Sequence, residues 1–240
     1  MFLKPKLILQ LVLLIVTSTL PSDGLWASET ELIKVPVRAY FIFNKDLGKV
    51  SVSREQKSLQ NTLLNVNKIW QQAGIEFYFQ EQGFYQPKDL KRYKRYLERD
   101  RELTAINSIC PRTKNGLKGI DLCVIGQRES NKGLFVSDFK IKNKINGRYV
   151  EPRLGRSDSR APRVVLPIKY GSRTKAPNAI KISQAFGVAL RLKRHESKPK
   201  TMYLMGRMPS KVLYGKDYTD IKLKPEEVAL ARENAAKIAQ

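Results

Sequence analysis

Residues 181–208, KISQAFGVALRLKRHESKPKTMYLMGRM, predict an amphipathic helix, then a basic loop, then a turn that contains a methionine. One set of apolar residues recurs with the helical period of about 3.6 residues and predicts a buried stripe: Ile182, Ala185, Phe186, Ala189, Leu190 and Leu192. A second set recurs at spacings of four, three and four residues and falls on a neighbouring face: Gln184, Val188, Arg191 and His195. The apolar stripe alone is also typical of a plain core helix that carries no functional site. If this helix does carry a site, we expect it on the second face.

This layout resembles the metzincin zinc metalloproteases, whose active-site helix carries H-E-x-x-H-x-x-G-x-x-H and is followed by a Met-turn beneath the metal. The family core L-A-H-E-L-G-H-A-L-G-L can be laid on residues 182–192, and Met205 is then the Met-turn candidate. The resemblance implies a single zincin-type domain of the α/β (α+β) class. Its mixed, twisted sheet would pack on long helices, with a cleft along an edge strand.

Every position that carries the family's chemistry is altered in this chain. Gln184 and Val188 replace the first two zinc histidines, Ala185 the glutamate, Arg191 the glycine and Arg194 the third histidine. His195, the one histidine of the sequence, follows one residue late. Loss of the glycine at Arg191 predicts that the helix runs on toward His195, because glycine turns most easily with positive φ.

These replacements predict that zinc, the cofactor expected for the family, has no ligand set here. A catalytic zinc site uses about three protein ligands and a water. Gln184 offers only a weak amide oxygen, Val188 no donor and Arg194 a permanent cation. Ala185 cannot act as a general acid or base. We therefore expect no metal and no catalytic residue; a peptidase with unconventional ligands is the enzyme alternative.

A non-catalytic, metalloprotease-like protein is the resulting interpretation. The former cleft would bind a peptide or an acidic ligand through Gln184, Val188, Arg191 and His195. Residues 163–168, RVVLPI, predict a strand that lies at an edge or ends near Pro167, since proline interrupts pairing. An edge strand in this region would hold an extended peptide by strand addition.

Three further segments carry the resemblance, and they are short. Residues 65–79, NVNKIWQQAGIEFYF, are similar to the family's first long helix where it enters the sheet. Residues 203–205 resemble the sequence of the Met-turn, and residues 223–232 resemble the closing helix of bacterial matrixin-like members. The other predicted strands are 31–44, a second strand that starts at 75–79, and 119–127, and a helix is predicted through Leu59, Leu63, Val66, Ile69 and Trp70.

The N-terminus and the cysteines predict export. Residues 1–27 have two lysines, an apolar run and a small residue at 27, as a cleaved secretory signal does; an uncleaved membrane anchor is the alternative. The domain would then cover residues 28–240, in the periplasm or outside the cell, and would not span the membrane. Cys110 and Cys123 are the only cysteines, and either a disulfide or two buried thiols fits the sequence.

The charge is strongly basic. Lysine and arginine number 45 against 22 acidic residues, a net charge of +23, which favours salt-dependent binding of polyanions. No specific nucleic-acid motif, G-x-S-x-G elbow or phosphate-binding glycine loop accompanies this charge. Charged insertions are predicted near 86–101 and 131–162. The first reads as one helix with interleaved tyrosines, either an anion-binding surface or a solvated helix bearing ion pairs.

Overall fold

A computed structural model describes residues 31–52, 59–111, 118–127, 135–136, 144–145, 148–149, 162–169, 179–194, 202–206, 208, 218 and 220–239. All of these except Glu31 belong to one compact unit, Leu32–Gln240. The predicted signal segment, His195 and most of the insertion near 131–162 lie outside the described residues.

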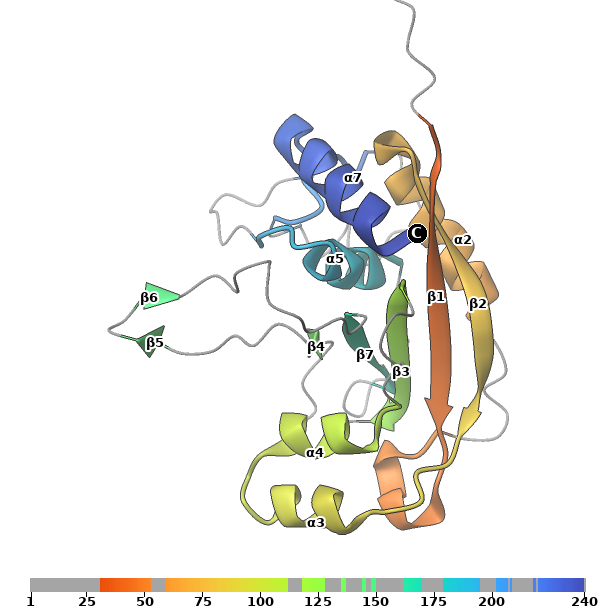
Figure 1. Ribbon diagram of the computed structural model, residues 1–240, viewed down its shortest axis with the longest axis vertical. Coiled ribbons are helices and arrows are strands. Elements are labelled where there is room, and N and C mark those ends of the chain that lie inside the picture. Colours follow the sequence, from red (N-terminus) through yellow and green to blue (C-terminus); the bar gives the residue numbers. More distant parts are fainter. Residues whose placement is uncertain are drawn as a thin grey trace, which may run out of the picture. The chain divides into compact units, whose positions relative to one another are not determined.

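Four parallel strands form the centre of a mixed sheet with the order β2-β1-β3-β7-β4 (Figure 1). The parallel strands are β1 (Ile33–Ile42), β2 (Ile75–Tyr85), β3 (Ile120–Gln127) and β7 (Arg163–Lys169). The short strand β4 (Phe135–Val136) pairs antiparallel with β7, and β5 (Lys144–Ile145) pairs with β6 (Arg148–Tyr149) in a separate two-stranded sheet. The predicted α/β class with a mixed sheet is confirmed.

The helices are of short to moderate length, where the resemblance implies long ones. They are η1 (Lys45–Val50), α2 (Gln60–Trp70), η2 (Gln71–Ala73), α3 (Lys91–Leu97), α4 (Glu102–Ile109), α5 (Ala179–Ala189) and α7 (Pro225–Ala239). α7 begins with a proline, and Glu227 accepts the backbone N–H of Lys224, which is half of a capping box. Among the described residues, no helix is long and apolar enough to cross a membrane.

The charged helix predicted within residues 86–101 is present as α3, but it is shorter than the segment, because the chain turns after Leu97 and α4 follows. Asp100 adopts a φ of 52°, in the left-handed region. The N–H of Arg101 donates to the Tyr96 carbonyl at 2.9 Å, and that of Asp100 donates to the Leu97 carbonyl at 2.9 Å. This pair of bonds is a Schellman motif, which ends a helix whatever its charge pattern.

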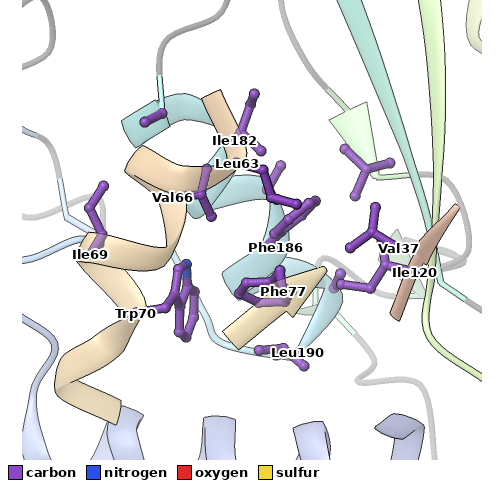
Figure 2. Packing of buried hydrophobic residues seen from close by; sticks show 14 of the residues in the cluster. Val37, Leu63, Val66, Ile69, Trp70, Phe77, Ile120, Ile182, Phe186 and Leu190 are labelled. Carbon is purple, nitrogen blue, oxygen red and sulfur yellow. The ribbon is translucent and has the colours of Figure 1, made fainter. Parts of the chain in front are cut away.

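One face of the sheet packs on α2, α5 and α7 through the larger apolar core (Figure 2). Phe77 of β2 lies between helices, with ring centroids 5.7 Å from Trp70 of α2 and 4.6 Å from Phe186 of α5. Val37 and Ile120 contribute to the same core from β1 and β3. Burial of these large side chains is the main favourable term that holds α5 against the sheet.

The opposite face packs on η1, α3 and α4 through a second, separate apolar cluster. It contains Tyr93 of α3, Ile106 and Ile109 of α4, and Ile125 of β3. A disulfide between Cys110 and Cys123, with 5.8 Å between the Cα atoms, ties the end of α4 to β3. The disulfide that the sequence left open is therefore confirmed.

A row of buried charges crosses the sheet on this second face. Arg38 pairs in register with Asp121, and Asp121 with Arg163, so neighbouring strands project the three side chains on the same side. Their exposed fractions are 3%, 2% and 2%. Arg38 Nε donates to Asp121 Oδ1 at 2.8 Å, and Arg163 Nη2 donates to the Pro111 carbonyl, just after α4, at 2.7 Å. The row thus joins three strands and the α4 connection.

At both edges of the sheet, part of the backbone is not free to pair with a further strand. On β2, the Asn67 side chain accepts the Phe77 N–H and donates to the Phe77 carbonyl, both at 2.9 Å, in place of a neighbouring strand. On β7, Val164 and Val165 pair with β4. β7 continues two residues beyond Pro167, so the predicted strand neither ends at this proline nor forms the edge where β4 covers it.

Replacing Asp121 with asparagine is expected to lower the free energy of unfolding by about 3 kcal/mol or more, because the Arg38 guanidinium stays buried without its carboxylate. Urea unfolding followed by circular dichroism measures this change. Adding Arg38→Met to the same chain should restore part of the loss, since no uncompensated charge then remains at that position. Equal stability of Asp121→Asn and the natural protein would contradict a structural role for the charge row.

Candidate functional site

Helix α5 positions the candidate site, and its buried side is as the sequence predicts. Ile182, Phe186 and Leu190 are at most 3% exposed and pack in the larger core (Figure 2). The remaining predicted positions of the stripe are buried as well: Ala185, Ala189 and Leu192. Because this stripe fixes the rotation of the helix, it decides where the second face points.

Gln184 occupies the first zinc position of the resemblance, and its side chain points toward the turn that contains Met205. The side chain is only 6% exposed. Its Nε2 donates to the Leu204 carbonyl at 2.8 Å and, in a longer contact of 3.4 Å, to the Gly206 carbonyl. A buried amide held in this way joins α5 to a segment twenty residues further along the chain. It satisfies backbone acceptors and does not project into solvent.

Met205 lies against α5 at Gly187. It is fully buried, in a turn that the Gly206 N–H closes on the Tyr203 carbonyl at 2.9 Å. A Cβ built on Gly187 would stand 2.5 Å from Met205 Sδ, so only glycine lets the thioether approach this closely. The sequence comparison singled out Met205 but missed Gly187, whose position within an apolar stripe gives no signal of this contact.

The prediction that the helix continues toward His195 is wrong, because α5 ends at Ala189. Arg191 adopts a φ of 67°, in the left-handed region. Its N–H donates to the Val188 carbonyl, and the Leu192 N–H to the Gly187 carbonyl, both at 2.8 Å. This is a second Schellman motif, and buried Leu192 provides its usual apolar contact. The motif holds the turn although arginine replaces glycine.

The exposed part of the second face is cationic. Val188 and Arg191 are half-buried, and Arg194 is exposed. Burial lowers the pKa of Arg191; burial, followed by the charge of Arg194, lowers the pKa of Lys181. Lys181 lies seven residues before Val188 on α5, about two helical turns, so the two side chains share one side of the helix. The structure therefore brings Lys181 to this site, a residue that sequence reasoning did not include.

The residues at the zinc positions do not fit a metal. Gln184 directs its amide N–H groups at carbonyls, Ala185 and Val188 carry no donor, and Arg194 is a cation. Within the described ranges, no group of three His, Cys, Asp or Glu side chains is placed to hold a metal ion. No catalytic step can be derived from these side chains.

A small apolar cavity lies on the other side of α5, away from Gln184. Its lining includes Leu63, Phe79, Leu122, Ile182 and Phe186, and its volume is about 10 Å³. A cavity of that size holds at most one water and no organic ligand. This cavity is therefore not a ligand site, and the exposed cationic face of α5 is the candidate.

Comparison with known proteins adds no family to this picture. No model of a protein family matches the chain, and no curated protein matches it significantly. The metzincin resemblance therefore depends on the residues already named.

Replacing Arg191 with glycine is expected to raise the free energy of unfolding by about 0.5 to 1 kcal/mol. The left-handed conformation costs a non-glycine residue about 1 to 2 kcal/mol, which exceeds the extra chain entropy that glycine loses. Thermal unfolding of Arg191→Gly beside Arg191→Val measures the effect, and the β-branched valine should lower the melting temperature. A lower melting temperature for the glycine variant would show that contacts of the arginine side chain outweigh the backbone strain.

Proposed function

We propose that this chain is an exported, non-catalytic protein on a metalloprotease-like scaffold, and that it binds a peptide or an acidic ligand over α5. The observation that carries the proposal is the bond from Gln184 Nε2 to the Leu204 carbonyl, 2.8 Å long. It replaces a possible metal ligand with a structural link between the helix and the turn beneath it. The frame of the resemblance is then kept by packing and hydrogen bonds alone.

Three features of the fold support the scaffold part of this proposal. The sheet is mixed, with four parallel strands and an antiparallel strand at the β7 side. The turn at Arg191 has the left-handed backbone that the family's glycine favours. Met205 packs against the middle of α5, as a Met-turn would beneath an active-site helix. Each of these is a packing feature that can persist after the chemistry is lost.

The ligand part of the proposal follows from the charge of the exposed face. Lys181, Arg191 and Arg194 are cations on or directly after α5, and Val188 on the same helix is half-buried. Carboxylates form charge-assisted hydrogen bonds with arginine, and the apolar Val188 can contact a side chain between them. A peptide with acidic residues has the chemistry that fits this face.

Zinc content tests the non-catalytic reading. After exposure to zinc and dialysis, the natural protein is expected to retain far less than one zinc per chain by elemental analysis. The triple variant Gln184→His, Val188→His and Arg194→His should retain about one, because it supplies three imidazole ligands in the frame of the resemblance. If the natural protein retained about one zinc per chain and His195→Ala lost it, the proposal of a non-catalytic protein would be wrong. A folded triple variant without zinc would contradict the metalloprotease-like frame.

Binding of a fluorescent hexaglutamate peptide, followed by anisotropy at low salt, tests the acidic ligand. Arg191→Glu combined with Arg194→Glu is expected to weaken binding by about 10-fold or more, through lost attraction and new repulsion. The matched control reverses two exposed cations elsewhere, Lys68→Glu and Lys237→Glu. If both pairs weakened binding equally, net charge and not the α5 face would account for the attraction.

A further inference from the structure

Helix α3 turns all of its charge to solvent. Lys91, Arg92, Lys94 and Arg95 are exposed, and they are called here the α3 basic face. Between them, Tyr93 is only 4% exposed and packs in the second apolar cluster. The helix is thus amphipathic, and it contains no carboxylate in its sequence KRYKRYL. One turn of helix rises about 5.4 Å, so the four cations crowd into a small area.

Among the residues that the structure describes, no carboxylate pairs with these cations. The ion pairs found there join Lys34 to Glu76, Arg38 to Asp121, Lys224 to Glu226 and Lys237 to Glu233. Asp89 at the start of the helix uses a carboxylate oxygen to accept the Lys91 N–H at 2.8 Å. The sequence left two interpretations of this segment open. The first, a solvated helix bearing ion pairs, is not supported, because these ion pairs are not found among the described residues. The second, an anion-binding surface, is therefore favoured.

The α3 basic face is held rigidly and apart from α5. The Schellman motif at Asp100 fixes the turn into α4, and the Cys110–Cys123 disulfide fixes the end of α4 on β3. α3 and α4 pack on the sheet face opposite to the one covered by α2, α5 and α7. In Figure 1 they also lie at the far end of the strands from α5 and α7. A partner that binds α3 therefore leaves the cationic face of α5 open.

We propose that the α3 basic face docks the protein on an anionic lipid bilayer, through the phosphate groups of the lipids. Four exposed cations on one side of a helix suit an extended anionic surface, and clusters of 4–8 basic residues bind such membranes. Single-stranded nucleic acids are held by stacking on exposed aromatic rings, whereas Tyr93 is buried and the Tyr96 ring lies under Arg95, 5.5 Å from its guanidinium carbon. The association is peripheral and electrostatic, because the apolar side of α3 is already used in the fold.

Co-sedimentation of the full protein with vesicles of about 70% phosphatidylcholine and 30% phosphatidylglycerol tests the proposal. The variant is Lys91→Gln, Arg92→Gln, Lys94→Gln and Arg95→Gln, because glutamine keeps the helix propensity and removes the charge. Each basic residue near an anionic membrane contributes roughly five-fold to binding, so the affinity should fall by about 100-fold or more. Raising the salt concentration should release the natural protein, and vesicles of phosphatidylcholine alone should not bind it.

The matched control removes the same charge from exposed sites outside α3: Lys34→Gln, Lys68→Gln, Lys222→Gln and Lys237→Gln. It should lose no more than a few-fold in affinity. Equal losses in the two variants would overturn the proposal in favour of attraction by net charge. Failure of the natural protein to bind anionic vesicles, with α3-dependent binding of heparin or an oligonucleotide, would also overturn it and identify a soluble polyanion as the partner. Near-ultraviolet circular dichroism verifies that both variants are folded.

Discussion

The buried pair of Arg38 and Asp121 is the constraint on which the arrangement of the sheet depends. Two charges with about 3% exposure are stable only when each meets its partner, because desolvation costs several kcal/mol for each ion. A shift of β1 against β3 by one residue would separate them and would turn every apolar side chain to the other face. The pair therefore favours one register, and Arg163 extends the same row to β7.

This register divides the molecule into two apolar clusters with different roles. On one face, alternate residues of the strands receive α2, α5 and α7; on the other they receive α3 and α4, closed by the disulfide. The two cationic surfaces, over α5 and on α3, lie on helices that pack against opposite faces. Each can therefore change by mutation with little effect on the packing of the other, since distant sites are close to additive.

Periodicity predicted most of the elements, because buried stripes and alternating strands are local signals. The strands β1, β3 and β7 and the helices α2, α5 and α7 all follow from such patterns. The end of α3 was missed because its left-handed residue is Asp100 and not glycine, and the end of α5 was missed for the same reason at Arg191. At α5 the buried Leu192 anchors a turn that the propensity of arginine opposes, whereas at α3 the turn residue Asp100 is exposed and belongs to a residue type that adopts the left-handed conformation more readily. The distal half of β2, Gln80–Tyr85, was missed because its exposed polar residues lack the apolar alternation of a strand.

The candidate site shows the same division between what is local and what is not. That Ala185 and Val188 offer no metal donor, and Gln184 only a weak amide oxygen, follows from their side chains alone. That Gln184 binds the Leu204 carbonyl, and that Gly187 admits Met205, depends on a segment about twenty residues away and could not be read locally. The amide bond, worth about 1 kcal/mol, and the close contact of Met205 with Gly187 both hold the turn against α5. Because these contacts lie on the buried side of the helix, they fix where its exposed face points without taking part in any binding there.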